Sequence, residues 1–417
     1  MFHLNGIVFN MHILFLTDNF PPEGNAPASR TFDHTKEWVD IGHKVTVITC
    51  APNFPEGKLF KGYKNRWVSK EVVEGINVWR VKTYITANTG FIKRSIDFIS
   101  FMFSSFFFGM FIKRVDVVVG TSPQFFTVIS AWALAKIKRS PFVFELRDIW
   151  PASIEAVGAV KSNWVIKVFE NIELFLYKQA ELIISVTHSF KNELIQRGID
   201  HRKIKVVLNG VDLEKYKPVK EKDRELVKNY GLNNKFVVGY VGTHGMAHAL
   251  ESVLDAAELS KDNNKVKFLF VGGGADRHRL EVLVEKRKLT NVIMMPLQPK
   301  DKMPSILSLL DISLVHLKNT PLFKTVIPSK IFESMAMGLP IIISIPEGEA
   351  TKMIENLGTG VVIPAEDAES LSNKINELSI DTNLITTLTS NSIIAAKQFS
   401  RKRLAKNMLK YLEEIVK

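Results

Sequence analysis

The chain has 417 residues, of which 46% are hydrophobic and 24% charged, so it is long enough for two globular domains with separate cores. Its only cysteine, Cys50, excludes an internal disulfide and a thiolate metal cluster, and it favours a reducing compartment. The net charge of +12 favours an anionic partner: a lipid headgroup surface, a lipid-linked phosphate or a nucleic acid.

The first ten residues have neither the charged start nor the long apolar stretch of a cleavable signal peptide. Met11 instead opens an apolar run with the length of a buried strand. We therefore expect residues 1–10 to be an upstream misreading or a dispensable tail, and the folded chain to begin at residue 11.

Short apolar runs alternate with helical segments along the first half of the chain. This alternation predicts a parallel sheet covered by helices on both faces. Strands are expected at 13–16, 44–49, 115–120, 142–146, 180–186 and 205–207, and helices at 29–41, 124–136 and 189–197.

The second half repeats the alternation, which predicts a second doubly wound α/β domain. Strands are expected at 236–241, 267–271, 292–295, 312–315, 341–345 and 360–363, and helices at 249–260, 276–286, 300–310 and from 328 onward.

A proline- and charge-rich segment, 209–225, separates the two halves. We expect one domain at 11–208 and another at 209–395, while 396–417 form a last helix that packs back across the domain junction. Ligands of such open sheets bind beyond the carboxyl ends of the strands, so a shared site would lie in the cleft between the domains.

The positive charge is concentrated in the first domain, where residues 58–139 hold fourteen Lys and Arg against four acids. Within this stretch, residues 98–112 contain seven phenylalanines, and pairs of basic residues flank them in the segment 93–114. Fifteen residues are short for a membrane span, whereas a helix lying in the membrane interface fits the flanking cations. The alternative is a buried helix of the first domain.

The loop that follows the first strand contains small residues before a helix. Gly24 and Asn25 would let the backbone approach a ligand closely, and Arg30 brings a charge suited to phosphate. The loop is not GxGxxG, so it does not predict a dinucleotide site, and a long connection is the alternative.

A second polar group follows the strand 142–146. Glu145 and Asp148 are placed to position or deprotonate a hydroxyl, and Trp150 offers an apolar face for a sugar ring. The alternative is an ion pair of Arg147 with Asp148 that caps the strand.

The third group opens the helix that begins near Pro328. Ser329 and Lys330 fall in its first turn, where unpaired N–H groups and the helix dipole form an anion site. Glu333 lies one turn further on the same face, so Lys330 and Glu333 together would hold a phosphate and a sugar hydroxyl. The alternative is an ordinary surface ion pair.

Other chemistries lack their motifs. The ten histidines show neither HxH nor HExxH spacing, so no catalytic metal is expected. The sequence contains no GxSxG and no GxxxxGK[ST], which leaves serine hydrolases and P-loop enzymes without support.

Taken together, these stretches resemble glycosyltransferase family 4, whose members have the GT-B fold of two Rossmann-like domains facing each other across a cleft. The resemblance is carried by NGVD (209–212), YVGTHG (240–245), FVGGG (270–274), DISLVHL (311–317) and PSKIFESMAMGLPII (328–342). DNFPPEGNAPASR (18–30) and FELRDIWPAS (144–153) are similar to bacterial transferases of O-antigen and capsule synthesis, including those that add N-acetyl-fucosamine.

The resemblance implies a retaining, metal-independent transfer from a nucleotide sugar, with the donor mainly on the second domain and the acceptor on the first. Glu333 matches the second glutamate of the family's E-x7-E motif, which binds the donor ribose. Thr325 stands where the first glutamate would be, so the backbone N–H groups of Thr325, Val326 and Ile327 are expected to replace it.

Thr243 and His248 occupy the positions of the family's phosphate-binding Arg and Lys. Because both changes remove charge, Lys330 and the helix start become the expected diphosphate clamp, with Arg30 assisting. Leu297 matches the segment whose backbone contacts the nucleobase, and Gly24-Asn25 matches the family's glycine pair.

The implied function is transfer of an N-acetylated deoxyhexose or hexosamine from a UDP-linked donor to a lipid-linked or polysaccharide acceptor, at the inner face of the cell membrane. The donor is a substrate, and no cofactor is expected. A GT-B UDP-sugar epimerase and a nucleotide-sugar-binding partner without catalysis are the alternatives. Nucleic-acid binding is not expected, because no such motif is present.

Overall fold

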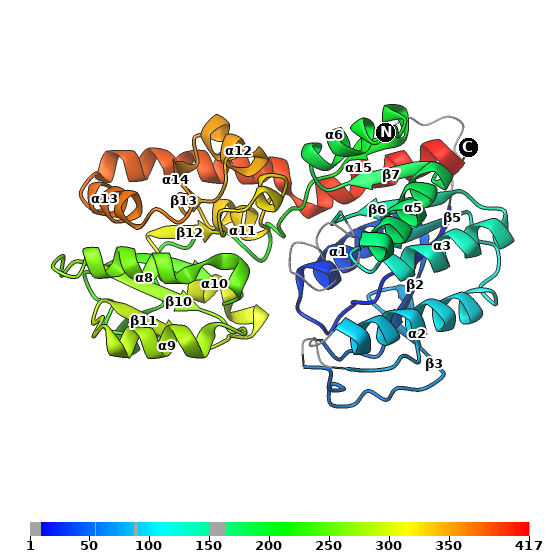
Figure 1. Ribbon diagram of the computed structural model, residues 1–417, viewed down its shortest axis with the longest axis horizontal. Coiled ribbons are helices and arrows are strands. Elements are labelled where there is room, and N and C mark those ends of the chain that lie inside the picture. The colour runs from blue at the N-terminus through cyan, green and yellow to red at the C-terminus, as the bar shows by residue number, and fades with distance from the viewer. Residues whose placement is uncertain (1–9, 55, 87–90, 150–162, 417) are drawn as a thin grey trace. The chain divides into compact units, whose positions relative to one another are not determined.

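The structure is a computed structural model that describes residues 10–54, 56–86, 91–149 and 163–416. The chain forms two compact units (Figure 1). Unit 1 comprises Met1–Leu208 together with Arg401–Lys417, and unit 2 comprises Asn209–Ser400. The segments 1–9 and 150–162, which include Trp150, lie outside the described residues.

Unit 1 is built on an eight-stranded sheet in the order β3-β4-β2-β1-β5-β6-β7-β8. All neighbouring strands are parallel except β3 and β4. The strands are β1 (His12–Leu16), β2 (Lys44–Cys50), β3 (Val68–Val73), β4 (Ile76–Val81), β5 (Val117–Thr121), β6 (Phe142–Leu146), β7 (Leu182–Ser185) and β8 (Ile204–Val206).

Helices cover both faces of this sheet, as the alternating sequence predicts. They are α1 (Ala26–Ile41), α2 (Phe91–Gly109), α3 (Phe125–Lys138), α5 (Asn163–Gln179), α6 (His188–Gln196) and α15 (Arg401–Val416). On one face, Ile13 and Phe15 of β1 share a core with Trp38 of α1 and Leu412 of α15. On the other face, Gly120 of β5 lies directly beneath α3.

The last helix, α15, belongs to unit 1. The indole Nε1 of Trp38 donates a hydrogen bond to the carbonyl of Ala405 at 2.9 Å, and Arg401 pairs with Asp33. Residues of α15 that share one helical face, Leu404, Met408 and Leu412, are buried in the unit 1 core. The terminal helix therefore completes the first sheet's covering layer.

The sequence did not predict the β3–β4 hairpin. Its turn consists of Glu74 (φ 48°) and Gly75 (φ 80°), both in the left-handed region that a two-residue hairpin turn requires. A Cβ on Gly75 would lie 2.7 Å from Val39 of α1, so the turn also needs glycine for space.

Unit 2 contains a parallel sheet of six strands in the order β11-β10-β9-β12-β13-β14. The strands are β9 (Phe236–Val241), β10 (Val266–Val271), β11 (Val292–Met295), β12 (Ile312–His316), β13 (Ile341–Ser344) and β14 (Gly360–Ile363). Tyr240 and Phe270 pack with α8 (Leu250–Leu259), α9 (Arg277–Lys286) and α13 (Ala368–Leu378) on one face. Gly239 faces Leu310 on the other.

The remaining helices of unit 2 are α7 (Arg224–Asn229), α10 (Met303–Leu307), α11 (Lys330–Ala336), α12 (Glu349–Leu357) and α14 (Thr382–Ala396). The expected fold, two doubly wound α/β domains, is confirmed. Each sheet has a topological switch point, where successive strands begin to be added on the opposite side of the first strand. It lies between β1 and β5 in unit 1 and between β9 and β12 in unit 2. In folds of this kind the crevice beyond the carboxyl ends at such a point binds the ligand.

Candidate functional site

The switch point of unit 2 places Lys330, the second-half residue singled out by the sequence, over the end of β9. Gly242, which follows β9, has φ +150°, and a Cβ there would lie 2.8 Å from the Lys330 Nζ. The glycine therefore leaves the space that the lysine side chain fills. The ammonium also lies 3.6 Å from the centre of the Tyr240 ring.

The Lys330 ammonium is shielded from solvent and has no hydrogen-bond partner among the described residues. Burial lowers its pKa to about 7, and the nearby Glu333 carboxylate only partly opposes this shift. Burying a cation without a counter-ion is costly, and the contact with Tyr240 offsets only part of that cost. An anion beside this ammonium would favour its charged form.

Two neutral histidines border this ammonium. His244 is fully buried, and neither of its ring nitrogens has a hydrogen-bond partner in the described structure. Burial lowers the pKa of His244 to about 4, with a further contribution from Arg277. Burial, followed by the charge of Lys330, lowers the pKa of His248 to about 4, and its Nδ1 is also without a partner.

His248 is the last residue of the short 3-10 helix η2 (Met246–His248), and its amide donates a hydrogen bond to the Gly245 carbonyl at 2.9 Å. Its carbonyl accepts a hydrogen bond from the His316 ring at 2.7 Å, and Tyr240 donates its hydroxyl proton to the Thr243 carbonyl at 2.9 Å. Sequence reasoning identified Thr243 and His248 but missed His244. The signal was available, because His244 follows the same strand end.

The helix start differs slightly from the expectation. Helix α11 begins at Lys330 with Ser329 as its N-cap, whereas the sequence placed its first residue at Pro328. The Pro328 carbonyl already accepts the Ile331 amide at 3.1 Å, so the difference lies within the usual uncertainty of helix ends. The alternative of a surface ion pair does not fit, because the Lys330 ammonium is buried and makes no hydrogen bond.

The segment before α11 lies at the same edge. Thr325 ends the short helix η4 (Pro321–Lys324), and its hydroxyl donates to the Leu322 carbonyl at 3.1 Å. Val326 is half-buried and Ile327 is buried. Glu333 is half-buried on α11, one turn after Lys330.

The glycines after β10 allow strand ends to approach closely. A Cβ on Gly272 would lie 1.9 Å from the Gly242 carbonyl oxygen, and the His244 amide donates to the Gly273 carbonyl at 2.8 Å. Leu297, beyond β11, is 71% exposed, and a Cβ added to Gly273 would lie 3.6 Å from the Cβ of Leu297. The open apolar surface of Leu297 therefore borders the same strand ends.

The switch point of unit 1 carries acids rather than bases. Asp18, directly after β1, accepts hydrogen bonds from Asn19 and, across the switch point, from Gln124 ahead of α3. Asn25 caps α1 by accepting the Ala28 amide at 2.9 Å and donates to Asn19 at 2.7 Å. Gly24, beside Asn25, is exposed.

Two further carboxyls complete an acid cluster, which we define as Asp18, Glu23 and Asp97. One Glu23 oxygen accepts the Asn53 and Phe54 amides at 2.8 and 2.9 Å, while the other is buried without a partner. Burial raises the pKa of Asp18 to about 6, of Glu23 to about 7 and of Asp97 to about 8.

The acid cluster escaped sequence reasoning because Asp97 comes from α2, distant from Asp18 in sequence. The only available signal was an aspartate directly after a buried strand.

Arg30 and Glu145 require a correction. The Arg30 Nε donates to Glu145 at 2.9 Å, and its two terminal nitrogens donate to the carbonyls of Leu208 and Val207 at 2.7 and 3.0 Å. Both side chains are at most 3% exposed. This buried pair ties α1 to β6 and to the end of β8, so its geometry is that of an internal brace rather than of an acceptor or phosphate site.

Asp148 lies just beyond β6 and is half-buried, and its amide donates to the Ser122 hydroxyl at 3.3 Å. Arg147, its neighbour, is turned inward, where it donates to the Pro27 carbonyl at 3.3 Å. Of the expected acceptor-site residues that the structure describes, Arg30, Glu145 and Asp148, only Asp148 has a position at the strand end that is suited to a ligand.

In the part of the chain that the structure describes, no three His, Cys, Asp or Glu side chains gather as ligands for a metal ion. Across the same residues, no helix has both the length and the hydropathy needed to cross a bilayer.

Comparison with known proteins agrees with this architecture. Residues 28–215 match the family described as Glycosyltransferase Family 4, and residues 222–394 match Glycosyl transferases group 1. The putative colanic acid biosynthesis glycosyl transferase WcaI of Escherichia coli K12 is 26% identical over 370 residues, which are 87% of this chain and 90% of that protein. A diphospho-undecaprenol N-acetylgalactosaminyltransferase of Campylobacter jejuni is 25% identical over 68% of this chain and 73% of that protein.

Solved structures share the whole fold. Anabaena HepE in complex with UDP and glucose superposes with a TM-score of 0.73 at 20% identity, covering 97% of this chain and 100% of that one. Sucrose-phosphate synthase of Thermosynechococcus elongatus gives a TM-score of 0.75 at 17% identity, covering 97% and 99%.

Two doubly wound domains, each with a polar switch point, define a protein of the GT-B fold. The chain belongs to the glycosyltransferases, with a family 4 domain in its first half and a group 1 domain in its second, and it is an enzyme. This assignment removes the alternative of a binding partner without catalysis.

Proposed function

We propose that this enzyme transfers a sugar from a UDP-linked donor, bound at the switch point of unit 2, to a lipid-linked acceptor in cell-surface glycan synthesis. The observation that carries the proposal is the buried ammonium of Lys330, which has no hydrogen-bond partner among the described residues and lies beside the glycine that follows β9. Supporting it, HepE was solved with UDP and with UDP-glucose, and two bacterial relatives carry names that specify diphosphoundecaprenol substrates.

In this proposal the donor diphosphate lies against Lys330, the Gly242 backbone and the first turn of α11. Negative charge builds on the diphosphate as the glycosyl bond breaks, and a preorganised cation stabilises that charge most in the transition state. Thr243, His248 and the buried His244 border the same ammonium, so their ring and backbone groups are the remaining candidates to contact the phosphates.

The nucleoside is assigned to the neighbouring strand ends. Glu333 takes the ribose hydroxyls, and the exposed Leu297 segment contacts the base. The amides of Thr325, Val326 and Ile327 take the donor sugar. Retention of configuration, an N-acetylated deoxyhexose or hexosamine as the sugar, and independence of metal ions are parts of the proposal that rest on the family resemblance.

The acceptor is assigned to the switch point of unit 1. Asp148 keeps its proposed role in orienting the acceptor hydroxyl, and Asp18 joins it because its carboxyl lies where β1 and β5 diverge. Neither the Arg30 brace nor its partner Glu145 takes part. A carboxyl held partly protonated by burial can donate to one hydroxyl oxygen and accept from another.

The membrane is the proposed place of action, through one face of α2. That helix buries Phe101 and Ser105, whereas Phe103 and Phe107 are 64% and 52% exposed. One face of α2 is therefore buried in unit 1, and the other carries exposed phenylalanines. The exposed face, flanked by basic residues, supports a peripheral location at the inner face of the cell membrane.

A panel of nucleotide sugars, each incubated with the enzyme and a lipid-diphosphate glycan, tests the proposal. We expect one donor to give a longer lipid-linked product together with nucleoside diphosphate, and Lys330→Ala to slow the formation of both about a hundred- to thousandfold. An isomerised nucleotide sugar formed without acceptor would identify an epimerase instead. Equal product formation by Lys330→Ala would overturn the placement of the donor.

A further inference from the structure

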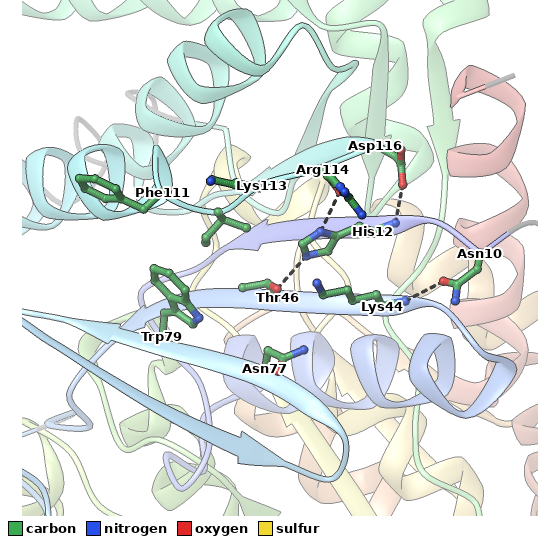
Figure 2. A pocket seen from close by; sticks show the side chains of 11 residues that line it. Asn10, His12, Lys44, Thr46, Asn77, Trp79, Phe111, Lys113, Arg114 and Asp116 are labelled. Atoms are coloured by element: carbon green, nitrogen blue, oxygen red, sulfur yellow. Dashed lines mark hydrogen bonds between the residues drawn. The ribbon is translucent and has the colours of Figure 1, made fainter.

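A pocket of about 830 Å³ lies at the edge of the unit 1 sheet opposite its switch point (Figure 2). Its wall includes His12 and Lys44, the first residues of β1 and β2, and Lys113 and Arg114 from the segment between α2 and β5. Because strands β1, β2 and β5 are parallel, these positions are at their amino ends, away from the acid cluster.

The pocket is positively charged. Within the described residues, the side chains of Lys44, Lys113 and Arg114 make neither an ion pair nor a hydrogen bond. Among the described residues of the wall, only Asp116 carries a carboxylate, and one of its oxygens accepts the His12 amide at 2.6 Å. Three cations therefore surround a space that holds one carboxylate, which is itself engaged.

The histidine in the wall adds no charge. The His12 ring bonds the Arg114 carbonyl at 2.9 Å and the Thr46 hydroxyl at 2.8 Å, so both nitrogens are occupied. Burial, with Lys44 nearby, lowers its pKa. The pocket's charge at neutral pH thus comes from its lysines and its arginine.

The mouth of the pocket continues into an apolar stripe. Phe111, which lines it, is 59% exposed and packs edge-on against Phe107 with ring centres 5.5 Å apart. Phe103 and Phe107 are spaced four residues apart on α2, and Phe111 lies in the turn just after the helix ends at Gly109, so the exposed phenylalanine stripe runs from α2 into that turn. An exposed aromatic stripe that ends in a basic pocket matches the two layers of a bilayer surface, acyl chains and headgroup phosphates.

We propose that this pocket binds the phosphate of an anionic membrane lipid while the phenylalanine stripe of α2 enters the acyl boundary. The inference rests on the membrane location proposed above and gives that location a specific headgroup site. Lys44, Lys113 and Arg114 bind the phosphate oxygens, and Trp79 and Phe111 contact the glycerol and upper acyl carbons. The site lies at the opposite sheet edge from the acceptor, so it anchors the enzyme without taking part in transfer.

Vesicle flotation with the full chain tests the proposal, using neutral phosphatidylcholine vesicles and vesicles with 30% phosphatidylglycerol. We expect the wild type to prefer the anionic vesicles. Changing Lys44, Lys113 and Arg114 together to Gln should lower that partition by up to about a hundredfold, because each basic residue near such a surface contributes roughly fivefold. The double variant Lys113→Gln/Arg114→Gln, in which both side chains are exposed, gives a fold-neutral version of the same test.

The matched control removes the same charge elsewhere in the basic region, from the exposed Lys61, Lys64 and Arg66. These residues precede β3 beyond the carboxyl end of β2, and therefore lie at the other sheet edge. We expect a clearly smaller loss for this control. Equal losses in the two triple variants would overturn the pocket and leave a diffuse charge effect.

Inorganic phosphate distinguishes a lipid headgroup from a free anion. We expect millimolar phosphate to leave vesicle binding unchanged beyond its ionic-strength effect, which matched sodium chloride measures. Saturable micromolar binding of phosphate, lost in the pocket variant while vesicle binding persists, would overturn the lipid assignment. Transfer to a short-chain, water-soluble acceptor should be unchanged in the pocket variant and lost in Lys330→Ala, so failure of the headgroup site and failure of the donor site give different results.

Discussion

The two switch points arise from the same topology, but buried acids surround the one in unit 1 and buried bases surround the one in unit 2. In unit 1, burial raises the pKa values of Asp18, Glu23 and Asp97, and in unit 2 it lowers those of Lys330 and His248. Desolvation therefore moves both sets of groups toward their neutral forms. The difference indicates which ligand each crevice is prepared to accept.

With a pKa of about 7, the buried Lys330 is only partly protonated at neutral pH, and an entering anion favours its charged form, so the proposal assigns the diphosphate to unit 2. The buried carboxyls of unit 1 have pKa values of about 6 to 8 and are partly protonated near neutral pH, which matches uncharged hydroxyl groups, so the proposal assigns the sugar acceptor to unit 1. In the proposed function, leaving-group stabilisation and acceptor orientation are therefore divided between the two sheets.

Removing the unit 2 charge should have the largest effect. Lys330→Ala is expected to lower kcat/KM for the donor about a hundred- to thousandfold, since one donor to developing charge contributes roughly 3–4 kcal/mol. Steady-state assays of nucleoside diphosphate release measure this, with circular dichroism as the check on folding. Unchanged turnover in a folded variant would sink the assignment of unit 2 as the charge-stabilising site.

Removing an acid from unit 1 should give a smaller and different effect. Asp18→Asn keeps the side-chain shape but loses the titrating carboxyl, so we expect kcat/KM for the acceptor to fall about tenfold to a hundredfold. Calorimetry should find donor binding unchanged. Asp148→Asn is a parallel test of the residue that sequence reasoning identified.

Glu145→Gln separates the brace from the acceptor site. Because this change removes the charged partner of the buried Arg30, we expect loss of thermal stability rather than a selective loss of acceptor affinity.

For the Asp18→Asn variant, equal weakening of donor and acceptor binding would mean that the two units do not have separate roles.

The contrast between the units also separates what sequence can and cannot predict. The parallel strands of both sheets other than β4, several of their covering helices and Lys330 follow from apolar alternation and from a local motif, whereas the β3–β4 hairpin and α5 do not. The Arg30–Glu145 brace and the contribution of Asp97 depend on contacts between residues more than seventy positions apart, for which a single sequence carries no periodicity. The burial that shifts the Lys330 pKa is likewise a property of packing, because only the fold places Tyr240 and Gly242 around its ammonium.

The pH dependence of kcat/KM for the donor tests the role of Lys330 in unit 2. Donor binding needs the Lys330 ammonium, whose pKa is about 7 in the free enzyme. We therefore expect kcat/KM for the donor to fall about tenfold per pH unit above that value, from this group alone. Lys330→Arg, which keeps its charge at alkaline pH, should lose this limb even if its plateau is lower. A limb that persists in the arginine variant would assign the titration to another group.

The smallest expected effect is on stability without ligand. The Lys330 pKa lies below its unfolded value, so the unfolded chain binds more protons between about pH 7 and 10.5 and wild-type stability rises with pH through that window. Lys330→Met removes the buried charge and keeps the stem, so we expect it to be more stable by about 1–2 kcal/mol at pH 7, with the advantage shrinking toward pH 10. Urea unfolding at pH 7 and pH 9.5 measures this difference. A methionine variant less stable than the wild type at pH 7 would mean that the ammonium already has a partner in the free enzyme, and that unit 2 is not held ready for an anion.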